Sequence, residues 1–192
     1  MSNLDKQISS TIADWLGDIV ALESHVEEAM DHQLKLDAAS ESLKRAIQQF
    51  HDTVRDSKQR AVAYQEQYGS TAGNPVIKAG SEILGKAAGV IDKIRHDSVS
   101  KSLRDDYTAY NHVAIAYTML HTTAMALEDS ATQQFAEEGL RTYAGMVQEL
   151  NNIIPEAVLM DLKHNGEVPV QDTDILDRCR ATIDRIWKTT SN

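Results

Sequence analysis

Scarce residue types exclude several classes of protein for this 192-residue sequence. The single cysteine, Cys179, cannot form an internal disulfide, which excludes a disulfide-stabilised secreted domain and fits a reducing compartment. Only three prolines and two phenylalanines occur, whereas alanine, leucine and glutamate are plentiful, so the composition favours helices. The first ten residues lack the basic and then apolar pattern of a secretory signal. We therefore expect a cytoplasmic protein.

Basic residues are also few. Nineteen lysines and arginines stand against 29 aspartates and glutamates, which leaves a formal net charge of −10. Nucleic-acid backbones and anionic lipid surfaces both attract basic proteins. The charge balance therefore predicts that neither nucleic acid nor a membrane is a partner. The length is that of one domain with, at most, a small appendage.

Charge is absent altogether from one stretch, the 21 residues of Tyr107–Leu127. Its length would suffice for a membrane span, which needs about 20 predominantly apolar residues. However, Asn111, His112, His121 and several threonines and tyrosines would each need a polar partner in lipid. Apolar residues occupy every side of the helical wheel, so the stretch is predicted to be the central, buried helix of a soluble bundle.

Apolar residues that recur every three or four positions predict a chain built from helices. The predicted helices cover residues 10–34, 37–69, 76–95, 102–127 and 130–163, and a last amphipathic helix begins at Asp172 or Thr173. Asp37 is the predicted N-cap of the second helix, and Ser102 with Asp105 forms a predicted capping box. Pro155 is predicted to break or restart the helix over 130–163.

The region 69–102 differs from the helical pattern on either side of it. It holds five of the nine glycines, together with Pro75. We interpret it as a crossover between two helical hairpins, a connection that one class of four-helix bundle requires. The predicted fold is thus all-α, with the bundle over residues 1–165. Residues 166–192 are predicted to form a linker and a helix that packs on the bundle or on a partner.

Glu23 is the best candidate for a metal ligand, because it lies at the edge of the apolar stripe of the first helix. A di-metal carboxylate site also needs glutamates from other helices and Glu-x-x-His motifs. The sequence contains no Glu-x-x-His, and the uncharged stretch Tyr107–Leu127 of the predicted central helix carries no carboxylate. The alternative is that Glu23 pairs with Lys58, a tyrosine or water. One carboxylate does not make a metal site, so the balance favours this alternative.

The histidines and tyrosines of the uncharged stretch allow two readings each. His112 and His121 are either hydrogen-bonded core residues, which is the commoner case, or metal ligands. The tyrosines are either core residues with a polar end or the lining of a small-ligand pocket. That pocket would be formed by Tyr110, Tyr117, His121 and Tyr143.

Two segments carry a family resemblance. Residues 103–124, LRDDYTAYNHVAIAYTMLHTTA, and residues 142–151, TYAGMVQELN, resemble bacterial ferritin-like proteins of the YciE/YciF stress-associated type. The likeness covers most of residues 12–158 as a pattern of whole helices. It implies a ferritin-like four-helix bundle with a crossover helix and one or two extra C-terminal helices. It also implies pairing as dimers and, in several members, a di-metal site.

The ligands of that site carry over poorly. Glu23 falls where the family has its first-helix glutamate. However, Asn111-His112 stands where members show Glu-His, and residues 141–144, Arg-Thr-Tyr-Ala, replace a glutamate-rich run. The resemblance therefore implies the fold together with a degenerate di-iron site.

Two functions remain as expectations. The first is a homodimeric, non-enzymatic scaffold with no cofactor, which acts as a structural or interaction component of a bacterial stress response. In that case the surface of the last helix, including Trp187, is a candidate interface. The second is a ferritin-like oxidoreductase that binds iron or manganese through a reduced site built on Glu23 and one or both of His112 and His121.

Overall fold

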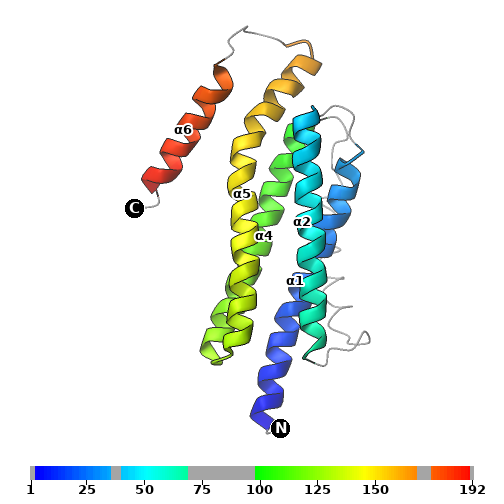
Figure 1. Cartoon of the computed structure of the whole chain (residues 1–192), viewed down its shortest axis with the longest axis vertical. Coiled ribbons are helices and arrows are strands. Elements are labelled where there is room, and N and C mark those ends of the chain that lie inside the picture. Colours follow the sequence, from blue (N-terminus) through cyan, green and yellow to red (C-terminus); the bar gives the residue numbers. More distant parts are fainter. Residues whose placement is uncertain (1–2, 36–39, 69–97, 168–173, 191–192) are drawn as a thin grey trace.

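The described part of the chain is entirely helical. A computed structural model describes residues 3–35, 40–68, 98–167 and 174–190, with side chains described from residue 10 to residue 188 of those ranges. These residues form α1 (Asn3–Gln33), α2 (Glu41–Glu66), α4 (Val99–Ala126), α5 (Ser130–His164) and α6 (Ile175–Thr190), and none of them forms a strand (Figure 1). The prediction of an all-α fold is confirmed. None of the described helices is both long and apolar enough to cross a membrane.

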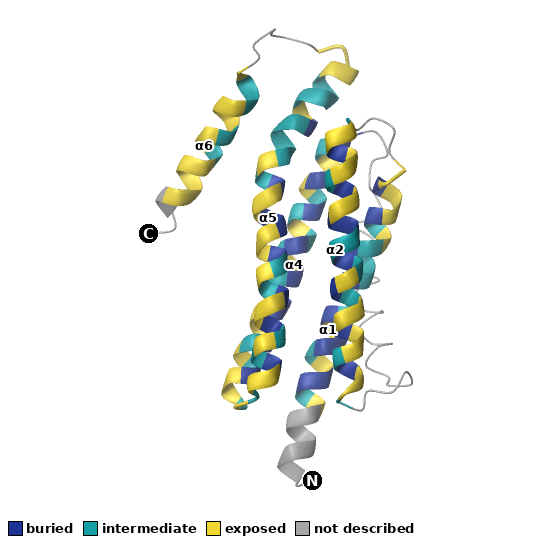
Figure 2. Ribbon diagram, in the orientation of Figure 1, coloured by how far each residue is buried: buried dark blue, intermediate teal, exposed yellow. Residues whose placement is uncertain are grey.

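Four of the helices pack side by side in an antiparallel ring. Contacts between α1 and α2 pair Glu23 with Ser57 and Asp31 with His51. Contacts between α1 and α4 run in the opposite sense along each helix, from Glu23–Tyr117 to Gln33–Asp106. In the same way α5 lies antiparallel to α4 and to α2. The packed core therefore lies along the axis that the four helices share (Figures 1 and 2).

This arrangement makes α2 and α4 parallel to each other. Tyr68, just after α2, bonds to Asp129 at the start of α5. Ser98, just before α4, bonds to Asp161 near the end of α5. The two residues thus lie at opposite ends of the bundle. The predicted crossover helix over 76–95 belongs to residues 69–97, which are outside the described part of the chain.

Several predicted helix ends are wrong because partners from other helices decide them. The predicted capping box at Ser102 does not form, since α4 begins at Val99 with Ser98 as its N-cap. The Asp161 carboxylate of α5 accepts hydrogen bonds from the backbone N–H groups of Val99 and Ser100 and from the Ser98 hydroxyl. This anion at the helix N-terminus stabilises an extra turn.

Ser40, and not Asp37, caps α2 through a 3.2 Å bond from the Leu43 N–H. Asp129 caps α5, which begins at Ser130 as predicted. The predicted break at Pro155 does not occur, since α5 continues through it to His164. The carbonyl of Asn152 in the turn before the proline accepts a hydrogen bond from Arg180 of α6 at 2.9 Å. Arg180 of another helix thus donates a hydrogen bond to a backbone carbonyl of α5 close to the point where Pro155 lacks the N–H of a regular helix.

The prediction that α4 is buried on all sides is wrong. One face carries core residues, among them Tyr110, Val113, Tyr117 and Leu120. The opposite face is open to solvent, where Ile115 and Met119 are 58% and 43% exposed. Met125, near the end of the helix, is 56% exposed. The uncharged stretch therefore combines a buried stripe with an exposed apolar one.

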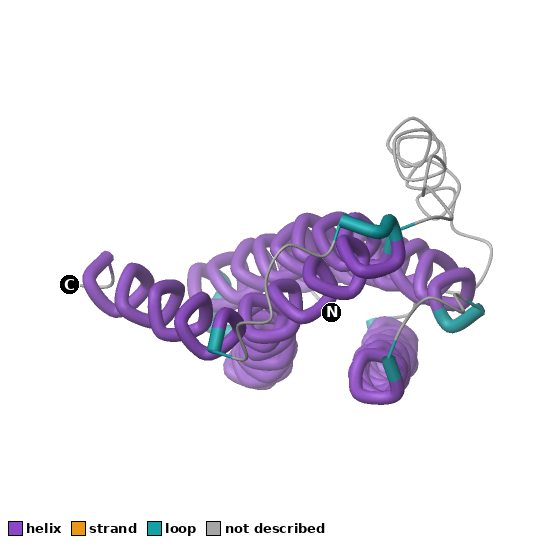
Figure 3. Tube along the Cα trace, turned by 90° about the horizontal axis from the view of Figure 1, so that it is seen from above, coloured by secondary structure: helices purple, strands orange, loops and turns teal. Residues whose placement is uncertain are grey.

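The helix α6 lies outside the ring of four. It contacts α5, and its C-terminal part leads away from the ring, as Figures 1 and 3 show. Residues 168–173, between α5 and α6, lie outside the described part. Arg180 supplies its hydrogen bond to α5 and also approaches Glu156 at 3.9 Å.

Candidate functional site

The Glu23 carboxyl group lies in the middle of the core with no exposed surface. Its Oε1 accepts hydrogen bonds from the Ser57 hydroxyl of α2 at 2.7 Å and from the Tyr117 hydroxyl of α4 at 3.0 Å. The two hydroxyls are themselves 3.3 Å apart. The structure therefore agrees with the alternative in which Glu23 pairs with a tyrosine, here Tyr117, and it adds Ser57 as a second hydrogen-bond partner. Lys58 does not contribute, because it pairs with Glu27.

A third hydroxyl comes from Tyr143 on α5, so each helix of the ring contributes one residue to this cluster. Tyr143 is fully buried and close enough to influence the Glu23 pKa. Yet its hydroxyl and the second oxygen of Glu23, Oε2, are buried without a hydrogen-bond partner of ordinary geometry. We refer to Glu23, Ser57, Tyr117 and Tyr143 as the hydroxyl cluster.

Burial controls the protonation of this cluster. Desolvation raises the pKa of Glu23 to about 7, against the lowering effect of the hydrogen bonds from Ser57 and Tyr117 and of the nearby Tyr143 hydroxyl. Burial, together with the charge of Glu23, also raises the pKa of both tyrosines well above the usual range. The phenols therefore remain protonated donors, and Glu23 exchanges a proton near neutral pH.

Close packing fixes the ring that delivers the Tyr117 hydroxyl. The ring lies against the backbone of α5 at Gly139, where an added Cβ would be only 2.2 Å from Tyr117 Cε1. The Tyr117 ring also stacks on the ring of Tyr143, with the two ring centroids 5.9 Å apart. Tyr143 in turn contacts Tyr110 edge-on at 6.1 Å. The three tyrosines proposed as pocket lining are thus packed against one another in the core.

The histidines proposed as metal ligands lie elsewhere. His112 is exposed, which corrects its prediction as a core residue, and His121 is half-buried. Among the described histidines the buried one is His51 of α2, whose Nε2 lies 3.0 Å from Asp31 Oδ1. Among the residues that the structure describes, no three histidine, cysteine, aspartate or glutamate side chains are grouped to hold a metal ion. Glu23, His112 and His121 are therefore not such a group.

The donors around Glu23 fit a di-metal centre poorly. Iron and manganese in such centres are held by several carboxylates and imidazoles. Here the neighbours of the single carboxylate are a serine and two tyrosines. The cluster instead forms a hydrogen-bonded core motif around one acid.

Sequence reasoning missed a second buried acid, Asp106 of α4. It is 3% exposed and accepts a 2.6 Å hydrogen bond from the Gln33 side chain at the end of α1. A signal was present, since Asp106 shares the helical stripe of Tyr110, Val113 and Tyr117 at spacings of four, seven and eleven. An acid in a buried stripe carries the same cost as Glu23.

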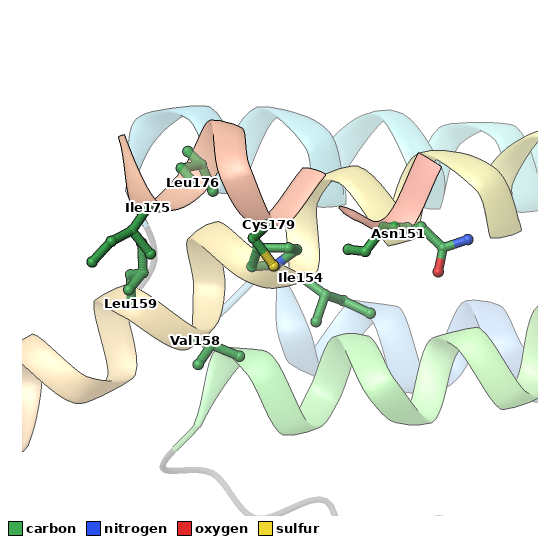
Figure 4. A pocket seen from close by; sticks show the side chains of 9 residues that line it. Asn151, Ile154, Val158, Leu159, Ile175, Leu176 and Cys179 are labelled. Atoms are coloured by element: carbon green, nitrogen blue, oxygen red, sulfur yellow. The ribbon is translucent and has the colours of Figure 1, made fainter. Parts of the chain in front are cut away.

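An apolar groove separates α5 from α6. Its volume is about 360 Å³, and its walls are formed by side chains of both helices (Figure 4). Ile154, Val158 and Leu159 line it from α5, and Leu176 and Cys179 from α6. The groove shows that α6 covers the surface of α5 incompletely.

Comparison with known proteins gives a family but no activity. Residues 8–163 match the model of the family described as "Domain of unknown function (DUF892)", so the chain belongs to that family. No curated protein and no solved structure matched the chain. The match covers the ring of four helices and ends before α6.

Proposed function

We propose that this protein is a ferritin-like helical bundle of the YciE/YciF stress-associated type whose di-metal site is degenerate. It acts in the cytoplasm as a structural or interaction component of a bacterial stress response, without an enzymatic reaction of its own. The resemblance of residues 103–124 and 142–151 to that type supports the proposal.

The order of the helices supports the ferritin-like part. Two antiparallel hairpins, α1–α2 and α4–α5, pack so that α2 and α4 run parallel. A chain with this arrangement needs a long connection between its second and third bundle helices, as in ferritin-like folds. Tyr68 and Ser98, the described residues on either side of that connection, lie at opposite ends of the bundle.

The observation that carries the functional part is the set of neighbours around Glu23. Its position is that of the first-helix glutamate of the family, yet its hydrogen-bond partners are Ser57 and Tyr117. Hydroxyl donors satisfy a carboxyl oxygen that would otherwise need a cation. The alternative, an iron or manganese oxidoreductase built on Glu23, His112 and His121, has less support, because His112 is exposed while Glu23 is fully buried.

Metal content tests this proposal. The protein and a Glu23→Gln variant would be purified from medium supplemented with iron and manganese and compared by elemental analysis. The amide keeps an acceptor for Ser57 and Tyr117 and adds a donor toward Tyr143. We expect metal well below one ion per chain in both proteins, and undiminished stability of the variant at neutral pH. About two ions per chain in the parent, lost in the variant, would overturn the proposal.

An interaction component needs a surface, and the exposed face of α4 supplies a candidate. Ile115 and Met119, one turn apart, lie there within a stretch that has no charged residue. Exposed apolar side chains grouped on one face are typical of interaction sites. We propose that the homodimer forms through this face; the surface of the last helix around Trp187 is the other candidate interface.

A further inference from the structure

We infer that Asp106 holds a proton in the folded protein, and that its carboxylic acid group forms a pair of reciprocal hydrogen bonds with the side-chain amide of Gln33. This acid–amide pair joins the last residue of α1 to α4. It is separate from the hydroxyl cluster and does not depend on the proposed function.

The geometry shows one of the two bonds directly. Gln33 Nε2 donates to Asp106 Oδ1 at 2.6 Å, between residues that are 73 positions apart in the sequence. The remaining polar atom of each group, the amide oxygen Oε1 of Gln33 and the carboxyl oxygen Oδ2 of Asp106, is buried and has no hydrogen-bond partner. It is unusual in a folded protein that two side chains joined by a hydrogen bond each keep a buried polar atom without a hydrogen-bond partner.

A single proton resolves both defects. A carboxylate and an amide oxygen can only accept hydrogen bonds, so an ionised Asp106 leaves both atoms unsatisfied. A proton on Asp106 Oδ2 turns that atom into a donor, and the atom available to accept is Gln33 Oε1. Two planar groups already joined by one such bond present their remaining donor and acceptor to each other, as in a carboxylic acid–amide dimer.

The surroundings favour the protonated form. Burial is the largest cause of a pKa for Asp106 that is raised to about 7. The hydrogen bond from Gln33 lowers this pKa, and the charge of the neighbouring Asp105 carboxylate raises it further. Tyr110, one turn further along α4, donates its hydroxyl to the Met30 sulfur atom of α1 and so gives no bond to the acid. Its own pKa is raised by burial and by Asp106.

The sign of the pH dependence follows from the direction of the shift. The pKa of Asp106 is higher in the folded protein than its model value of 3.8. Its contribution to stability is therefore complete below about pH 4 and is lost as the pH rises through about 7. The acid–amide pair is closed in mildly acidic solution, and in alkaline solution it opens at the point where α1 ends. The pair is thus a pH-sensitive contact between α1 and α4.

Infrared spectroscopy tests the proton directly. The experiment uses the full chain with Glu23→Gln, so that the other buried acid does not contribute. We expect the C=O stretch of a protonated carboxylic acid near pH 6, its loss as the pH is raised to about 8, and its absence when Asp106→Asn is added. A spectrum without this band near pH 6 would overturn the inference, and this measurement does not require the Asp106 variant to fold.

Chemical denaturation supplies the second readout. From the two pKa values, ionisation of Asp106 should lower the folding equilibrium constant about 30-fold between about pH 5.5 and pH 8. The comparison is made in the same Glu23→Gln background, so that the raised pKa of Glu23 adds no pH dependence of its own. Asp106→Asn keeps both hydrogen bonds as an amide–amide pair but cannot ionise. We expect this part of the pH dependence to disappear in the Asn variant. The same 30-fold loss in both proteins would contradict the inference.

Discussion

Single residues decide how the four helices meet at the hydroxyl cluster. Gly139 has no side chain, which lets the Tyr117 ring lie against the backbone of α5. The position of that ring places its hydroxyl 3.0 Å from Glu23. A residue on α5 thus controls a hydrogen bond between α1 and α4, although it touches neither partner atom of that bond.

Gly139→Ala should therefore destabilise the protein. The added methyl group would meet the Tyr117 ring at 2.2 Å, and the ring is held by Tyr143 on another side, so it has little freedom to move away. Overpacking of this kind costs about 1–3 kcal/mol. Urea denaturation at constant pH would measure the loss in the free energy of unfolding.

Gly145→Ala is the matched control on the same helix. An added Cβ there would meet nothing within 4 Å. Alanine is the better helix former, so this variant should gain about 0.5–1 kcal/mol. Equal effects of the two substitutions would show that helix propensity, and not contact with Tyr117, decides the stability at Gly139.

Sequence reasoning reached some of these residues. Glu23 could be found because an acid interrupts the edge of an apolar stripe, and a tyrosine was among its expected partners. Ser57 and Gly139 gave no comparable signal, because small residues occur on any helix face and their role depends on a neighbouring helix. Tertiary proximity, which a periodic pattern does not contain, was the missing information.

At the scale of helices, the existence of each described helix and the bounds of α5 could be predicted, whereas the starts of α2 and α4 could not. Periodicity located the helices because burial of an apolar stripe dominates their stability. The start of α4 depends on Asp161 of α5, and the serines at the start of α2 donate hydrogen bonds to Glu156 of α5. In each case the capping residue and its partner on α5 are more than 60 positions apart in the sequence, so no local motif reveals the contact.

The helix α6 is the element most weakly joined to the rest. Its contacts are made with α5, across a groove of about 360 Å³. A chain that ends at Glu167 should therefore keep a folded bundle, with an unfolding midpoint that changes by less than about 4 °C. Circular dichroism during heating would measure it. The full chain with Arg180→Ala, which loses the bond to Asn152, is the control for that single contact.

A large drop in the unfolding midpoint on removal of α6 would show that α6 is part of the folded core. A midpoint more than about 10 °C lower in the shortened chain would mean that the cover over Ile154 and Val158 contributes several kcal/mol. The division at residue 165 that the sequence predicts would then be wrong.

At the scale of the whole molecule, net charge restricts how two copies can meet. Each chain carries a formal charge of −10, so most pairs of surfaces repel each other. The stretch Tyr107–Leu127 contributes no charge to this repulsion, and one of its faces exposes Ile115 and Met119. Two antiparallel copies of α4 would place Ile115 of each opposite Met119 of the other, which is the self-complementary contact that two-fold symmetry requires.

Ile115→Lys should therefore abolish the dimer and leave the monomer folded, because Ile115 is already 58% exposed within one chain. Ile186→Lys on α6 is the matched control, since this isoleucine is 53% exposed next to Trp187. Sedimentation velocity would distinguish a 21.3 kDa monomer from a species of twice that mass. Loss of the dimer in the Ile186 variant alone would move the interface to α6, and a monomeric parent protein would exclude both faces. Added salt should strengthen the dimer of the parent, because it screens the repulsion between acidic surfaces and leaves the apolar contact on α4 intact.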